Sequence, residues 1–133
     1  MLSGKFLLTI IVIAVAINLI QWFFTGFLFH KYQSLTPSTW RKESNRSYAA
    51  SMILGLFQAF MFTTIFYFWK SRSGGLYLMD SIKFGLLCWL TFSVTTEINR
   101  AIYVNFSRMF VLGQCLSSLF EYVAAGIAAA LLL

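Results

Sequence analysis

Long runs of residues without a charged side chain constrain the fold of this chain more than any other feature. Phe6–Phe29 holds 24 residues without a charge, and Ser47–Trp69 holds 23. Met109–Leu133 holds 25 residues, with Glu121 as its single charged side chain. A helix of about 20 mostly apolar residues crosses a hydrocarbon core of about 30 Å. These three runs therefore predict three membrane-spanning helices.

A fourth helix is expected around the uncharged stretch between Lys83 and Glu97, which is only 13 residues long. Because this stretch is too short to cross a bilayer alone, the helix must include charged residues at its ends. The long aliphatic stem of a lysine lets its amine reach the interface. We predict that this helix runs from Ser81 to about Tyr103.

The composition agrees with a membrane protein, because 59% of the residues are hydrophobic and 11% are charged. A soluble domain carries about 25% charged residues. The sequence predicts an all-α integral membrane four-helix bundle that forms a single domain over residues 1–133. Its helices are expected at about 6–29, 47–69, 81–103 and 110–132.

The net charge of +6 comes mostly from basic residues that lie between the apolar runs. Loop lysines and arginines in such positions orient helices and contact anionic headgroups, so the lipid bilayer, and no nucleic acid, is the expected partner. Loops 30–46 and 104–108, with their flanks, carry six basic residues against four on the opposite side. The positive-inside rule then places both loops in the cytoplasm, although six against four leaves the orientation weakly specified.

Three helices each place a polar side chain near the expected midplane: Asn18, Gln58 and Glu121. Each lies about 16 Å from the side of loops one and three, at about 1.5 Å per residue. A charged side chain at the bilayer centre costs at least about 2.5 kcal/mol, so Glu121 should face the bundle interior or a subunit contact. Two interpretations stay open. The residues join helices by hydrogen bonds worth about 0.6 kcal/mol each, or they form a site for a proton, an ion or a small ligand.

A second group of polar residues is expected closer to the interface at residues 104–108. Glu97 and Arg100 are three residues apart on one helix face and can form an ion pair. Gln114, on the last helix, is expected to reach Glu97. The alternative is a solvated ion pair without a binding role.

Small residues recur every four positions on two helices, which predicts close helix contacts. The second helix carries Ser51, Gly55, Ala59 and Thr63, and the last helix has Gln114, Ser117, Glu121 and Ala125 on one face.

Motifs of known catalytic or metal centres are missing from the sequence. Its single histidine is His30, and Cys88 and Cys115 are 27 positions apart, without a Cys-x-x-Cys motif. Nucleophile-elbow, phosphate-loop and zinc-protease motifs are also absent. The sequence therefore predicts no enzyme, no cofactor and no metal.

The chain resembles a family of small bacterial four-helix membrane proteins catalogued as domain of unknown function 1761. The resemblance lies in Trp22–Phe29 at the end of the first helix, and in Gly85, Thr95, Thr96 and Asn99 on the third. Gly126-Ile127-Ala128 on the last helix is also similar, whereas the proline typical of the first segment is missing. The resemblance implies a four-helix fold in the bacterial inner membrane and supplies no activity.

These observations lead to two functional hypotheses. The first is a multi-pass, non-enzymatic membrane protein whose bundle packs or binds a partner. The alternative is a small transporter or channel for a proton-coupled or other small solute, with Glu121 as the coupling carboxylate. A single four-helix bundle encloses little water, so the alternative predicts a homodimer.

Overall fold

The computed structural model describes residues 3–42, 44–74 and 77–133, and it is built from helices. Four helical segments are long and apolar enough to cross a membrane, namely Gly4–Leu28, Asn45–Arg72, Leu78–Tyr103 and Arg108–Leu132. The first joins α1 (Gly4–Gln21) to the π-helical η1 (Trp22–Leu28), and the second is α2 (Asn45–Arg72). The third joins α3 (Leu78–Cys88), the π-helical η4 (Trp89–Val94) and α4 (Thr95–Tyr103), and the fourth is α5 (Arg108–Leu132). The predicted all-α four-helix fold is confirmed, and we call these segments the four spans.

The helix ends differ from the predicted ones by a few residues. The spans begin at Gly4, Asn45, Leu78 and Arg108, and α2 continues to Arg72. Runs without charge mark the part of a helix that lies in hydrocarbon, whereas backbone hydrogen bonding continues into the charged flanks. At Asn45 the earlier start has a local cause, because the Ser44 hydroxyl and the Ser47 backbone and side chain form a capping box.

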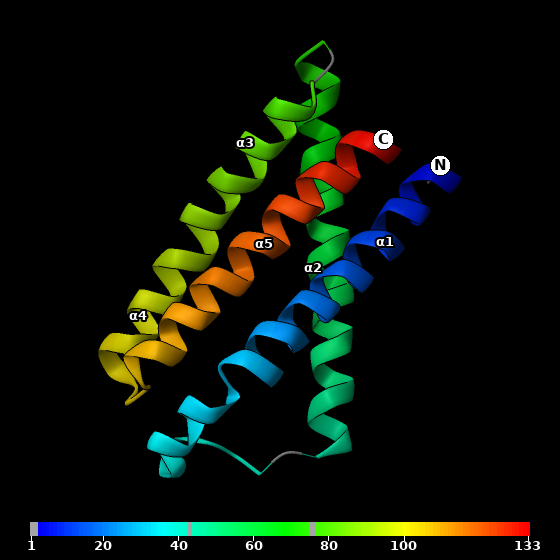
Figure 1. The fold of residues 1–133 in the computed structure, drawn as a ribbon. Coiled ribbons are helices and arrows are strands. Elements are labelled where there is room, and N and C mark those ends of the chain that lie inside the picture. The colour runs from blue at the N-terminus through cyan, green and yellow to red at the C-terminus, as the bar shows by residue number, and fades with distance from the viewer. Residues whose placement is uncertain (1–2, 43, 75–76) are drawn as a thin grey trace.

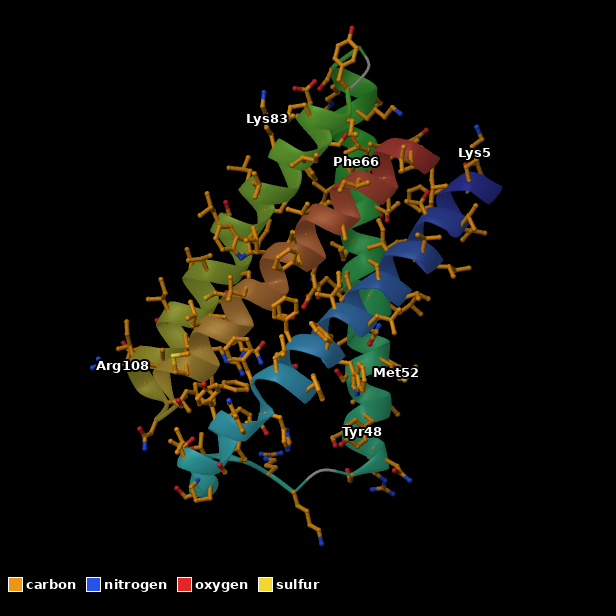
Figure 2. The ribbon with its side chains drawn as sticks, viewed as in Figure 1. Lys5, Tyr48, Met52, Phe66, Lys83 and Arg108 are labelled. Carbon is orange, nitrogen blue, oxygen red and sulfur yellow. The ribbon has the colours of Figure 1, made fainter. Side chains whose placement is uncertain are left out.

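The spans are arranged so that α5 packs between α1 and the third span, while α2 crosses behind them (Figure 1). The beginning of α1, the end of α2, the beginning of α3 and the end of α5 lie at one end of the bundle, and the turn between α4 and α5 lies at the other. Figure 2 shows Lys5 and Lys83 at the first end and Arg108 at the second. This is the up-and-down order that the sequence predicts.

The loop between the first two spans is more regular than expected, with two short 3-10 helices, η2 (His30–Leu35) and η3 (Pro37–Thr39). The Thr39 hydroxyl donates to the Asn105 carbonyl at 3.1 Å. The Trp40 ring packs on Phe106 and Phe110, with centroids 5.3 and 4.7 Å away. These contacts hold the loop against the turn between α4 and α5.

Aromatic rings and small residues form the core between the spans. Phe62 and Phe66 of α2 pack on Phe84 of α3, with ring centroids 5.5 and 5.6 Å apart. The predicted small-residue faces are buried at Gly55, Ala59 and Thr63 on α2, and at Ser117, Glu121 and Ala125 on α5. Since apolar burial does not drive helices together in lipid, such close van der Waals packing supplies the association.

Candidate functional site

Ten polar side chains of the four spans line one pocket of about 240 Å³, which we call the polar pocket. All four spans contribute to its wall. The lining residues are Gln21, Gln58, Phe92, Ser93, Thr96, Glu97, Arg100, Gln114, Ser118, Glu121 and Tyr122. Five of the six predicted site residues are among them, namely Gln58, Glu97, Arg100, Gln114 and Glu121. Two residues expected near the midplane, Gln58 and Glu121, therefore line the same pocket as the group expected near the interface.

Asn18, the sixth predicted residue, lies outside the polar pocket. Its amide donates to the Ala14 carbonyl at 2.8 Å, and its side chain packs against Gly55. It lines a different pocket of about 390 Å³, between the first span and the beginning of α2. From their equal depth, Asn18, Gln58 and Glu121 were expected to converge within hydrogen-bonding reach; Gln58 and Glu121 line one pocket, whereas Asn18 lines another. Equal depth places side chains at one level, but the rotation of each helix decides which pocket they face.

Glu121 lies at the middle of α5 and is only 7% exposed. The Ser117 hydroxyl donates to its carboxyl oxygen at 2.7 Å, from one turn earlier in the same helix. The predicted inward orientation of Glu121 is therefore confirmed. A hydroxyl donor and burial inside the bundle lower the cost of holding a carboxyl group at this depth.

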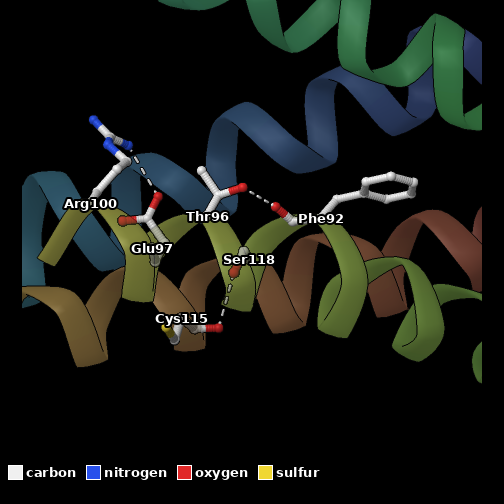
Figure 3. A network of polar contacts seen from close by, with 6 residues as sticks. All are labelled: Phe92, Thr96, Glu97, Arg100, Cys115 and Ser118. Atoms are coloured by element: carbon white, nitrogen blue, oxygen red, sulfur yellow. Dashed lines mark hydrogen bonds and ion pairs between the residues drawn. The ribbon is translucent and has the colours of Figure 1, made fainter. Parts of the chain in front are cut away.

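Glu97 and Arg100 form the predicted ion pair, with an Arg100 nitrogen 3.1 Å from a Glu97 carboxyl oxygen. The Glu97 side chain is 14% exposed and that of Arg100 is 56% exposed, so the carboxylate is the inner partner. Figure 3 shows both side chains on the same face of α4. The Arg100 guanidinium also lies 5.8 Å from the centre of the Phe106 ring, at the α4 end of the bundle. The pocket thus extends from an exposed charge pair to the buried Glu121.

Two hydroxyl groups of the wall donate to their own helices. The Thr96 hydroxyl donates to the Phe92 carbonyl at 2.6 Å, and the Ser118 hydroxyl donates to the Cys115 carbonyl at 3.1 Å (Figure 3). Because each proton is engaged in this way, the hydroxyl oxygen is left as an acceptor toward the pocket.

The π-helical segment η4 contributes Phe92 and Ser93 to the wall. Its first residue, Trp89, donates its indole N–H to the Cys115 carbonyl of α5 at 3.0 Å. This bond fixes the segment against α5 directly beside the pocket. π-Helical turns occur frequently at functional sites, and apolar periodicity gives no signal for them.

Gln21, Ser93 and Ser118 line the polar pocket and were not predicted as site residues. A signal for Gln21 was available, because it follows Asn18 by three residues and so lies near it on the helix surface. Gln21 also lines the pocket of Asn18, so it lies between the two. Serine is common in membrane helices at packing contacts, and the sequence alone does not separate those roles.

The polar pocket can offer hydrogen bonds of both kinds, from three glutamine amides and several hydroxyl groups. Its charged groups are two carboxyl groups and one guanidinium. Among the described residues, no cluster of three or more His, Cys, Asp or Glu side chains could hold a metal ion. Both cysteines are free thiols, as their separation in the sequence suggests. The arrangement suits the binding of a small hydrogen-bonding group.

Comparison with protein-family models, with curated proteins and with solved structures finds no match for this chain. The resemblance to the family catalogued as domain of unknown function 1761 therefore stays a prediction.

Proposed function

We propose that this chain is a non-enzymatic, multi-pass membrane protein that binds a small hydrogen-bonding group in the polar pocket. The observation that carries the proposal is the gathering of Gln58, Glu97, Gln114 and Glu121 around one pocket from three different spans. Polar groups within a membrane are expensive, and they are retained where they face a cavity or a ligand pathway. The bacterial inner membrane, with loops 30–46 and 104–108 in the cytoplasm, is part of the proposal.

The hydrogen bonds of the wall favour binding over the alternative in which these residues only join helices. The bonds made by Thr96, Ser118 and the Glu97–Arg100 pair each link residues of one span. The bond between Ser117 and Glu121 is also within one helix. Polar residues that hold helices together donate across the helix contact instead. In this chain Thr96, Glu97, Arg100, Ser118 and Glu121 line a shared pocket.

A second candidate function is transport of a small or proton-coupled solute by a homodimer. One observation favours it: the pocket reaches from the exposed Arg100 to Glu121 at the middle of α5. In proteoliposomes, transport coupled through this carboxyl group predicts flux that Glu121→Gln abolishes. Equal flux through wild type and Glu121→Gln would contradict this candidate and leave the binding proposal intact.

The binding proposal is tested by access of water-soluble reagents to the pocket. Ser118→Cys is made in a chain whose native cysteines are replaced by serine, and Phe120→Cys is the matched control on the same helix. Ser118 lines the polar pocket, whereas Phe120 is 50% exposed on the outer surface of the bundle, where lipid covers it.

The expected result is that a charged, membrane-impermeant methanethiosulfonate reacts with the thiol at position 118, in vesicles permeabilised to expose both sides. The thiol at position 120 should react much more slowly, because it lies in hydrocarbon. Equal, slow reaction at both positions would show a closed helix contact and contradict the proposal.

A further inference from the structure

An apolar groove of about 380 Å³ adjoins the polar pocket, and it has no role in the function proposed above. It lies between α2 and the third span, with Tyr122 of α5 also in its wall. Met61, Ile65, Phe84 and Cys88 line the part that is not shared with the polar pocket. Phe57 and Phe92 of its wall are more than half exposed, so the groove opens onto the outer surface that lipid covers.

The groove and the polar pocket lie side by side, because Gln58, Phe92 and Tyr122 line both of them. From this junction the polar pocket extends toward Arg100, at the α4 end of the bundle. The groove extends the other way, about 10 Å along α2 from Gln58 to Ile65 and about 12 Å along the third span from Phe92 to Phe84. The two cavities together, which we call the combined cavity, are therefore polar at one end and apolar at the other, along the direction of the spans.

We infer that this combined cavity is a binding site for a neutral, single-chain amphiphile, with a hydroxylated head in the polar pocket and an alkyl chain in the groove. The inference rests on the proposed function and names its ligand class.

The charges of the polar pocket select a neutral head. Arg100 is the one basic residue in the described wall of the pocket, and its guanidinium already pairs with Glu97 at 3.1 Å. A phosphate or carboxylate head would meet the carboxyl groups of Glu97 and Glu121 without a free cation. A glycerol-like head can donate hydroxyl protons to these carboxyl groups and accept from the amides of Gln58 and Gln114.

The size and composition of the groove favour a ligand with a single alkyl chain. Its volume is near the lower end of the range of about 300–1,000 Å³ that is typical of small-molecule sites. Its wall between Met61 and Cys88 is aromatic, aliphatic and sulfur-containing, and it offers no partner for a second polar group. A chain that leaves bulk lipid for this groove gains little from the hydrophobic effect, because both surroundings are apolar. The head therefore supplies the selectivity.

The experiment uses the full chain in phosphatidylcholine vesicles, with monooleoylglycerol that carries a diazirine near the middle of its chain, at the distance from the head that the groove spans. After irradiation, mass spectrometry maps the adducts. The inference predicts adducts concentrated at residues 61–65 and 84–88, which unlabelled monooleoylglycerol removes by competition and oleate does not. Adducts spread evenly over outward-facing residues such as Leu54 and Leu131, or equal competition by oleate, would overturn it.

Two variants test whether the adduct yield depends on the groove itself or on a general effect of the substitution on folding. Met61→Trp fills the groove from an exposed position, and Ile53→Trp places the same ring on a part of α2 outside the groove. Adduct yield should fall about fivefold in Met61→Trp, the factor expected for loss of about one favourable contact, and should stay unchanged in Ile53→Trp. Equal yields in both variants would contradict the site.

Failure of the inference and failure of the proposed function give different results. If the thiol at position 118 reacts with the impermeant reagent but the adducts are spread evenly, the polar pocket binds a small solute and the groove is only a lipid contact. If that thiol does not react, the pocket itself is closed and both proposals fall.

Discussion

Gly85 of α3 lies directly against the backbone carbonyl of Tyr122 in α5, so that a Cβ atom at position 85 would overlap this oxygen. Gly126 makes the reciprocal contact, because a Cβ atom there would lie 2.5 Å from the Ser81 carbonyl oxygen of α3. Two glycines thus set the distance between these helices, and with it the position of Tyr122 at the junction of pocket and groove. A backbone carbonyl cannot rotate away as a side chain can, so the helices must separate to admit a methyl group.

Gly85→Ala should therefore lower the free energy of unfolding by about 1–3 kcal/mol, the usual cost of overpacking. Reversible unfolding in mixed micelles measures the change. Gly4→Ala is the matched control, because nothing lies within 4 Å of a Cβ atom at that position. Equal stability of the two variants would contradict the close contact of α3 and α5.

The contact between Gly55 and Asn18 should behave differently, because the Asn18 side chain can move. A Cβ atom at Gly55 would lie 2.6 Å from the Asn18 side-chain nitrogen. We expect Gly55→Ala to be about 1 kcal/mol more favourable in an Asn18→Ala background than in the wild-type chain. A double-mutant cycle of unfolding free energies measures this coupling, and additive changes would show that the two residues do not touch.

Substitutions at Glu121 should show whether folding depends on the polarity or on the charge of the side chain at this position. Glu121→Gln and Glu121→Leu should insert and fold, because neither brings a charge to the middle of the span. Glu121→Lys should reduce the yield of folded protein strongly, because position 121 is 7% exposed and the Glu97 carboxylate of the same pocket is already paired with Arg100. A charged side chain at the helix centre costs about 2.5–3.5 kcal/mol. Size-exclusion profiles of detergent extracts compare the variants. A lysine variant as well folded as the glutamine variant would contradict the burial of position 121 inside the bundle.

The contacts of Trp40 predict a protective role at the end of the bundle. Trp40→Ala removes the ring that packs on Phe106 and Phe110, so the loop should detach and trypsin should cut faster after Arg41. Trp22→Ala changes an exposed tryptophan of the first span and should leave cleavage unchanged. Gel analysis of the fragments over time gives the two rates, and faster cleavage in both variants would indicate a general loss of stability.

Much of the fold could be predicted because charge and hydropathy report directly on the bilayer. The uncharged runs located all four spans, and the cost of a buried carboxyl group predicted the inward orientation of Glu121. Helix rotation and local winding are less visible in sequence. Asn18 has the same expected depth as Gln58 but faces another pocket, and the π-helical residues Phe92 and Ser93 carry no periodic signal.

The place where the groove and the polar pocket meet could not be predicted from the sequence either. It depends on how α2 and α5 lie against the third span. The contact of Gly85 with Tyr122 sets the distance between α3 and α5, and the hydropathy pattern does not specify such a contact. The sequence therefore predicted which residues are polar within the membrane, and the packing decides which of them share a pocket.

Binding in the polar pocket requires that water reach it inside the bundle, and spin labels at Gln58 and Leu54 measure this access. The two positions are one turn apart on α2, and Leu54 is nearer to the Asn45 end of the helix but 65% exposed on the outer surface. Collision rates with a water-soluble nickel chelate and with oxygen give the water accessibility of each label in vesicles. If water reaches the polar pocket, the label at position 58 should have the greater nickel accessibility, although this position lies deeper in the bilayer. Greater nickel accessibility at position 54 is the result expected from depth in lipid alone, and it would contradict water access to the pocket.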